Sequence, residues 1–288
     1  MKVYALWLGV FLGSVAWSAA QVSVELVLDQ DQFLLNESLP VKVRITNRSG
    51  QPLQLGQEKD WLSFTIESRD GYFVPSLGEV PVMGEQSVES SMVATRRVDL
   101  MPYYDLSKPG RYTVTASVKL KQWNQEVLSK PKPFEIARGT KIWEQEFGVA
   151  AAEGAPPDAR KYALQQANYV KRLMLYVRLT DVAERRVFKV FPAGPLVSFS
   201  KPEAQIDRTS NLHLLFQTGA RSFFYEIIGP DGEMLLRQTY DYTATRPVLQ
   251  TNDEGKTLVR GGIRRPTASD IPAPSATVST NEIKTPKL

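Results

Sequence analysis

Short segments in which apolar and polar residues alternate recur along this chain, and they constrain its fold more than any other sequence feature. A period of two places successive side chains on opposite faces of a strand, so each segment predicts a half-buried β-strand. In the first half of the chain the candidates are residues 22–28, 41–47, 61–67, 93–100, 111–120 and 133–136, and residues 29–38 are expected to form a polar connection. Several short strands separated by polar turns predict a β-sandwich over residues 21–138.

The second half predicts another antiparallel β domain over residues 158–265. Two hairpins are indicated, because Gly-Pro-Asp-Gly at 229–232 and Asn-Asp-Glu-Gly at 252–255 each separate two β-rich runs. Residues 159–170 fit either a helix face or an alternating strand. The remaining strand candidates are residues 173–179, 186–191, 196–199 and 211–216.

One local pattern in the first half points to a particular kind of sandwich. Asp105, Gly110 and Tyr112 lie just before and at the start of a late predicted strand. An acidic residue, a glycine turn and a tyrosine in this order resemble the tyrosine corner of immunoglobulin-like sandwiches. We therefore expect Tyr112 to be structural, with its ring on the core and its hydroxyl bonded back to the turn.

A family resemblance adds to this reading. Residues 39–53 resemble the second strand and turn of bacterial Ig-like modules, such as the BsuPI-type proteinase-inhibitor domain and macroglobulin-like domains. The whole chain also resembles uncharacterised exported bacterial proteins with an Ig-like front half. The motif resemblance spans residues 22–137 at most and implies an Ig-like fold there. It identifies no inhibitory residue.

The first twenty residues predict a secretory signal peptide. Met1 and Lys2 precede an apolar run over residues 3–15, and small residues Ser18 and Ala20 mark a cleavage site. The run is too short for a membrane span, so we expect an exported protein that starts at Gln21, lacks a transmembrane segment and works in the periplasm or outside the cell. The chain has no cysteine, which excludes disulfides and fits a bacterial periplasm.

Two further segments carry organisational predictions. Residues 139–157 are expected to form a junction between the domains, with an exposed loop or linker over its second part. Trp143 and Phe147 within it are either a hook for a partner or a clamp between the domains, and we favour the clamp. Residues 266–288 are rich in Pro, Ser and Thr and predict a disordered tail.

The sequence contains no recognisable catalytic, cofactor or metal site. His213 is the one histidine, and without a Gly-x-Ser-x-Gly elbow or an identifiable acidic partner we expect it to be structural. One histidine and no cysteine argue against zinc, and no acidic run matches a calcium loop. The formal net charge is +4, and acidic residues are interspersed among the basic ones along the chain. We therefore expect no nucleic-acid partner.

Aromatic residues near the second predicted turn are candidates for ligand contact. Tyr225, Tyr240 and Tyr242 lie close in sequence to Arg237, and such groups stack on sugars or anchor peptides; the alternative is that most of them are core. We therefore expect an exported, non-catalytic binding or structural protein of the bacterial cell envelope, whose partner is an unknown protein or carbohydrate. The alternatives are a proteinase-inhibitor or chaperone-like Ig module, and a polysaccharide hydrolase with two facing carboxylates.

Overall fold

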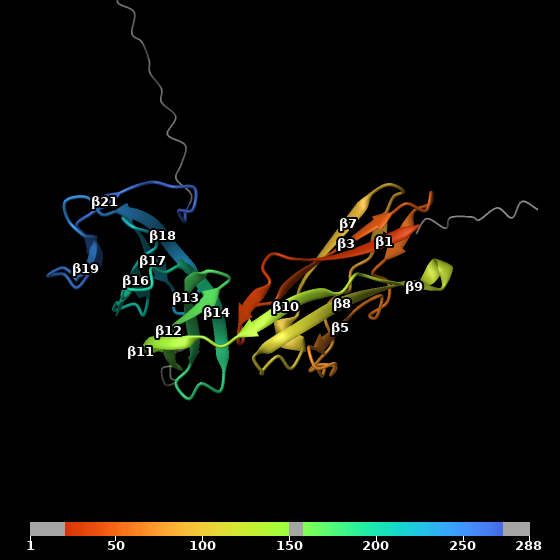
Figure 1. Cartoon of the computed structure of the whole chain (residues 1–288), viewed down its shortest axis with the longest axis horizontal. Coiled ribbons are helices and arrows are strands. Elements are labelled where there is room, and N and C mark those ends of the chain that lie inside the picture. Colours follow the sequence, from red (N-terminus) through yellow and green to blue (C-terminus); the bar gives the residue numbers. More distant parts are fainter. Residues whose placement is uncertain (1–20, 150–157, 273–288) are drawn as a thin grey trace, which may run out of the picture.

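The protein is a chain of strands arranged in two β domains. The computed structural model describes residues 21–149 and 158–272. Apart from two single-turn 3-10 helices, Met101–Tyr103 and Lys121–Trp123, the regular elements of this part are strands, so the mainly-β prediction is confirmed. The two domains lie end to end, with β10 of the first leading directly to β11 of the second (Figure 1).

The first domain is a sandwich of two sheets around one core. One sheet has the order β1-β3-β7, and the other has the order β2-β10-β8-β5 with β9 paired to β8. The strands of the first sheet are β1 (Val22–Leu28), β3 (Pro40–Asn47) and β7 (Val93–Asp99). Those of the second are β2 (Gln32–Leu34), β5 (Leu62–Ser68), β8 (Gly110–Leu120), β9 (Gln125–Leu128) and β10 (Lys132–Ala137). A small ladder joins β4 (Leu53–Leu55) to β6 (Gln86–Val88).

Alternation explains which side chains fill this core. Val41, Val43 and Ile45 of β3 are buried, whereas Lys42 and Arg44 between them reach solvent and form ion pairs. The prediction of a polar connection at residues 29–38 is corrected in one respect. This segment contains the three-residue strand β2, which pairs in parallel with β10. Three residues are too few to show an alternating pattern, so the sequence of this segment does not predict a strand.

Tyr112 occupies the position that the tyrosine-corner pattern predicts. Its hydroxyl donates to the backbone carbonyl of Lys108 at 2.6 Å. Its ring is buried and stacks on Phe134 with the centroids 5.6 Å apart. The hydrogen bond therefore fixes the turn before β8 to the face of the second sheet.

The second domain is a three-layer structure. A four-stranded sheet, β11-β12-β13-β14, packs against a five-stranded sheet, β15-β16-β17-β18-β21, and the hairpin β19-β20 forms a third layer. The first sheet contains β11 (Thr140–Val149), β12 (Asp158–Tyr169), β13 (Arg172–Asp181) and β14 (Val187–Pro195). The second contains β15 (Glu203–Ile206), β16 (Leu212–Gln217), β17 (Ser222–Ile228), β18 (Met234–Asp241) and β21 (Ile263–Arg264). The hairpin is β19 (Val248–Thr251) and β20 (Thr257–Arg260).

Both predicted hairpins of this domain are present, and the ambiguous segment is resolved. The two turns join β17 to β18 and β19 to β20, and Gly232 and Gly255 take positive φ angles of 79° and 80° there. Residues 159–170 belong to strand β12 and its turn, because both neighbours, β11 and β13, pair with this strand. The strand expected at 196–199 is absent, since β14 continues through the proline-containing stretch to Pro195 and ends there.

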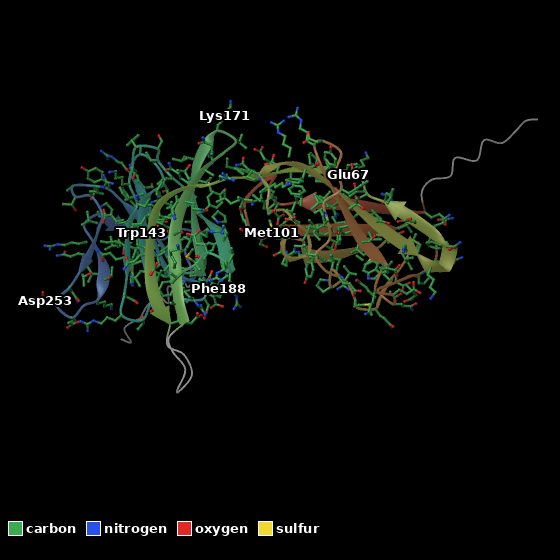
Figure 2. All side chains as sticks on the ribbon, turned by 90° about the horizontal axis from the view of Figure 1, so that it is seen from below. Glu67, Met101, Trp143, Lys171, Phe188 and Asp253 are labelled. Atoms are coloured by element: carbon green, nitrogen blue, oxygen red, sulfur yellow. The ribbon has the colours of Figure 1, made fainter. Side chains whose placement is uncertain are left out.

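Trp143 and Phe147 do not join the domains, which corrects the clamp prediction. They lie on β11, and both pack against the core of the second sandwich, where Phe147 stacks on Tyr162 with centroids 4.4 Å apart. Figure 2 shows Trp143 inside the second domain, away from the first. Residues 140–149 of the expected junction are therefore a strand of the second domain, and residues 150–157 lie outside the described residues.

The contact between the domains is made by other residues. Leu34 of β2 packs in one cluster with Tyr176 and Val190 on the outer face of the four-stranded sheet. Arg178 on the same sheet donates from Nη1 to the carbonyl oxygen of Leu35 at 3.2 Å. The predicted polar connection at 29–38 is thus the surface that meets the second domain.

The C-terminal prediction needs a partial correction. Residues 266–272 are ordered against the second domain: Asp270 is buried and pairs with Arg264 at 2.5 Å, and the backbone of Ile271 bonds to Arg237. Residues 273–288 and the predicted signal peptide at 1–20 lie outside the described residues. Within the described ranges, no helix is long and apolar enough to cross a membrane.

Candidate functional site

The candidate site lies on the outer face of the five-stranded sheet, beneath the β19-β20 hairpin. Every residue of β16 is buried, because one face of this strand meets the other sheet and the opposite face lies under the hairpin. Leu212, Leu214 and Phe216 belong to the core between the sheets. His213 and Leu215 alternate with them and face the hairpin instead, which explains how a histidine comes to be buried here.

Three polar side chains form a continuous hydrogen-bonded series on this face. His213 Nε2 lies 3.1 Å from Asp207 Oδ2, and His213 Nδ1 lies 2.7 Å from the hydroxyl of Tyr225. Tyr225 is on β17, displaced by two residues from Ile227, which pairs directly with His213. Diagonal neighbours in an antiparallel ladder are within reach of long side chains, so the register places the tyrosine beside the imidazole.

Asp207 is the fixed end of this series. It sits in the turn before β16, and its carboxylate accepts hydrogen bonds from five groups: the backbone and side chain of Thr209, the backbone and side chain of Asn211, and His213. Partial burial opposes ionisation, but the hydrogen bonds from Asn211, His213 and Thr209 outweigh it and lower the pKa of Asp207 to about 2. The carboxylate is therefore ionised at neutral pH.

The charge on Asp207 sets the direction of the whole series. An ionised carboxylate only accepts, so Nε2 of His213 must carry the hydrogen that bonds to Asp207. When the imidazole is neutral, Nδ1 is then an acceptor, and Tyr225 donates its hydroxyl hydrogen to it. Burial, with the nearby Tyr240 and Asp207, raises the pKa of Tyr225 to about 12, so this hydroxyl keeps its hydrogen.

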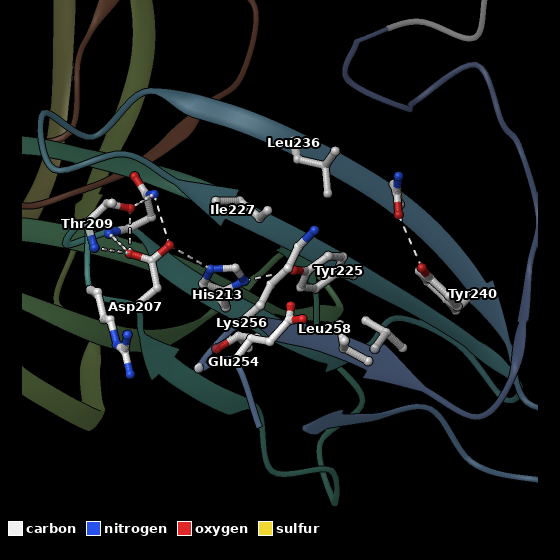
Figure 3. Close-up of a pocket in the computed structure, with 16 residues that line it drawn as sticks. Asp207, Thr209, His213, Tyr225, Ile227, Leu236, Tyr240, Glu254, Lys256 and Leu258 are labelled. Atoms are coloured by element: carbon white, nitrogen blue, oxygen red, sulfur yellow. Dashed lines mark hydrogen bonds and ion pairs between the residues drawn. The ribbon is translucent and has the colours of Figure 1, made fainter. Parts of the chain in front are cut away.

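Tyr225 and His213 border a cavity of about 620 Å³ between the sheet and the hairpin, called the hairpin cavity below. Figure 3 shows Tyr225, Ile227, Leu236 and Tyr240 on the sheet side and Glu254, Lys256 and Leu258 on the hairpin side. The remaining lining residues are Asp207, Arg208, Thr209, Asn211, His213, Gln238, Gly255, Thr257 and Val259. This volume is within the range of small-molecule sites, about 300–1,000 Å³.

The structure brings together two of the four residues predicted to contact a ligand. Tyr225 and Tyr240 meet edge to face in the hairpin cavity, with their centroids 6.4 Å apart. Arg237 does not belong to this group, because its side chain alternates onto the opposite face of β18 and pairs with Glu226. Tyr242 follows the end of β18, is 40% exposed and does not line the cavity. The structure therefore places Arg237 and Tyr242 outside the hairpin cavity, and ligand contact by the four residues stays a prediction.

The Glu226–Arg237 pair is an interior feature of the second sandwich. Arg237 Nε lies 2.6 Å from Glu226 Oε1, and Arg237 Nη2 donates to the carbonyl of Ala193 at 2.8 Å. Glu226 has no exposed surface, and its Oε2 has no hydrogen-bond partner among the described residues. Burial, opposed by the charge of Arg237, raises the pKa of Glu226 to about 7.

Sequence reasoning missed Asp207 and Glu226 for different reasons. Asp207 and Asn211 flank Thr209 in a polar turn just before an apolar strand, a pattern typical of an Asx turn, so the turn itself was readable. The contact of Asp207 with His213 spans six residues, and only the geometry of strand β16 shows that the two side chains meet. Glu226 sits in an alternating strand, and no local signal distinguishes a carboxylate facing the core from one facing solvent.

Two side chains that line the hairpin cavity are poorly suited to proton transfer. A tyrosine whose pKa is raised to about 12 is a poor base or nucleophile at neutral pH. Asp207, with its pKa near 2 and its oxygens occupied by five donors, cannot serve as a general acid. Among the described residues, no group of three or more His, Cys, Asp or Glu side chains is placed to hold a metal ion.

Comparisons with known proteins give this chain no family. No protein-family model matches it, and no curated protein matches it. One solved structure that aligns with it is Spo0M, a sporulation control protein from Bacillus subtilis, at 8% sequence identity and a TM-score of 0.30. The alignment covers 58% of this chain and 82% of that one. A TM-score this low does not establish a common fold, and the likeness to BsuPI-type and macroglobulin-like modules stays a prediction.

Proposed function

We propose that this chain is an exported, non-catalytic protein of the bacterial cell envelope that binds a ligand in the hairpin cavity. The observation that carries the proposal is the polar series Asp207–His213–Tyr225, which ends at the wall of the cavity. Burying three polar side chains in one series is unfavourable unless each is paired, and here the pairing is complete up to the tyrosine oxygen. Export follows from the predicted signal peptide.

A titration of the intact protein tests where a ligand binds. The ¹⁵N-labelled chain, starting at Gln21, is mixed with solubilised polysaccharide fragments and short peptides from a bacterial cell envelope, and amide shifts are followed. We expect shifts confined to β17, β18 and the β19-β20 hairpin. Tyr225→Phe should weaken binding and Tyr242→Phe should not, because Tyr242 lies outside the cavity.

Two results would contradict this proposal. Shifts that avoid the hairpin cavity would place the binding elsewhere. Chemical turnover of a bound fragment that His213→Gln abolishes while the amide spectrum stays intact would make the protein an enzyme, since glutamine cannot exchange a proton near neutral pH as histidine does.

A separate observation favours the proteinase-inhibitor alternative for the first domain. Tyr72 and Phe73 form an exposed aromatic pair, 74% and 69% exposed, beside a second cavity of about 740 Å³ that reaches Tyr112. Exposed aromatic side chains on a loop held by a rigid sandwich are typical of protein recognition. Incubation with chymotrypsin-like proteinases tests it: inhibition that Tyr72→Ala removes and Tyr242→Ala retains supports this function, and its absence with the native chain contradicts it.

A further inference from the structure

We infer that the hairpin cavity takes a neutral, hydroxyl-rich ligand of the carbohydrate class, and that the Tyr225 oxygen accepts a hydrogen bond from one of its hydroxyl groups. This inference rests on the proposed function and adds to it the chemical class of the ligand. It follows from three properties of the cavity wall: the direction of the buried hydrogen bonds, the position of an amide donor, and the balance of charge.

The first property is a fixed acceptor at the cavity wall. Tyr225 donates its only hydroxyl hydrogen to His213 Nδ1, 2.7 Å away, because Asp207 holds the hydrogen of the neutral imidazole on Nε2. The tyrosine oxygen can then offer the cavity only lone pairs. A ligand group that meets it must carry an O–H or N–H hydrogen, and a bare carboxylate, phosphate or carbonyl oxygen is rejected there.

The second property is a donor on the neighbouring strand. Tyr240 donates its hydroxyl hydrogen to Oε1 of Gln238 at 3.2 Å. That contact orients the amide of Gln238, which also lines the cavity, and leaves its nitrogen as a donor. An acceptor on β17 and a donor on β18 therefore lie on the same wall, and a sugar hydroxyl is a group that donates and accepts at once.

The third property is the charge of the lining. The cavity is bordered by two carboxylates, Asp207 and Glu254, and by two cations, Arg208 and Lys256. These formal charges balance, so the cavity has no net charge to select an anion or a cation. Apolar and aromatic groups, including Ile227, Leu236 and the Tyr240 ring, line the wall between the polar ones. Surfaces of this kind pack against the C–H faces of sugar rings.

The experiment measures hydroxyl recognition directly with defined probes. The full chain from Gln21 is titrated with the neutral hexasaccharides of the cello, malto and chito series, with hexagalacturonate and hexaglucosamine as charged probes, and with trialanine amide as a peptide probe. The best neutral sugar is then compared with its monodeoxyfluoro derivatives. Fluorine replaces a hydroxyl without a hydrogen to donate, so at one position we expect binding to fall about fivefold to tenfold, the worth of one hydrogen bond.

Variants at the buried series show whether Tyr225 is the acceptor. Tyr225→Phe should bind the hydroxyl and fluoro ligands equally. In His213→Gln the amide can donate to Asp207 and accept from Tyr225, so the preference for hydroxyl should remain. In His213→Leu the tyrosine hydrogen is released toward the cavity and the preference should vanish or reverse. If the leucine variant does not fold, the native chain and Tyr225→Phe still decide the question.

The outcomes separate this inference from the proposed function. Stronger binding of a charged oligosaccharide in the hairpin cavity would overturn the neutrality of the ligand, and stronger binding of the peptide there would overturn the carbohydrate class. Either result would leave a binding protein. Equal binding of every fluoro derivative to the native chain would overturn the acceptor role of Tyr225. Binding of envelope fragments only outside the cavity would overturn the proposed function together with this inference.

Discussion

The hydroxyl of Tyr225 and Nδ1 of His213 lie 2.7 Å apart, although the two residues are twelve positions apart in the chain and on different strands. The contact makes the only histidine of the sequence one link in a buried series instead of an isolated side chain. Its partners also explain why the ring is tolerated at 5% exposure.

Substitutions in this pair should affect stability by different amounts. Tyr225→Phe leaves Nδ1 of His213 buried without a donor, and His213→Leu leaves the Tyr225 hydroxyl without an acceptor, so each should lower the free energy of unfolding by about 1–3 kcal/mol. His213→Gln can keep both hydrogen bonds and should lower it less than His213→Leu. Urea unfolding, read by hydrogen exchange at β16 amides, measures this. Equal losses for glutamine and leucine would argue against the pairing.

The tyrosine corner of the first domain should also be measurable. Tyr112→Phe removes the hydroxyl that bonds to Lys108 at 2.6 Å, and we expect a loss of about 1 kcal/mol or more in the free energy of unfolding. Hydrogen exchange at β8 amides reports this domain within the full chain. Tyr72→Phe is the matched control, since Tyr72 is 74% exposed. An unchanged exchange rate in Tyr112→Phe would remove the stabilising role of the corner.

Glu226 should make the second domain less stable as the pH rises. Its pKa is raised from 4.5 to about 7 by burial, so the folded state binds more protons than the unfolded state between these values. Stability is therefore full below pH 4.5 and falls through pH 7, by about 3 kcal/mol at 1.36 kcal/mol per pKa unit.

Glu226→Gln is the matched variant for this prediction, because it keeps the size of the side chain and cannot ionise. The difference in unfolding free energy between the native chain and the variant, measured from pH 4.5 to 8 by hydrogen exchange at β17 amides, isolates Glu226 from the other titrating groups of the protein. A difference that stays constant over that range would contradict the prediction.

The export prediction has a direct readout. Ser18 and Ala20 set a cleavage site that makes Gln21 the first residue of the mature chain. Mass spectrometry of the protein recovered from the periplasm or medium of a producing bacterium should give a chain that starts at Gln21. A product that retains Met1 in the cytoplasm would contradict export, and Ala20→Lys should block cleavage if the site is correct.

Local sequence patterns determined the strands and turns that carry the fold. Alternation placed β3 and β8, and in β3 it also indicated which side chains are buried, because the side-chain period of a strand is fixed by its backbone. Turn chemistry at 229–232 and 252–255 fixed the two hairpins, since the glycines there adopt positive φ angles. Tyr112 was placed by its distance from Gly110 in the chain, because a hydrogen bond that spans four residues is nearly local.

Tertiary structure alone decided the site. Whether Arg237 faces the hairpin or the interior depends on which face of β18 meets the four-stranded sheet, and a strand with half-buried residues on both faces does not reveal it. Trp143 and Phe147 belong to the second domain because β11 pairs with β12. The contacts of His213 with Asp207 and Tyr225 need three segments brought together under one hairpin. Strand register and the packing of layers bring together residues that are far apart in the chain. Local periodicity in the sequence does not specify which of these residues meet.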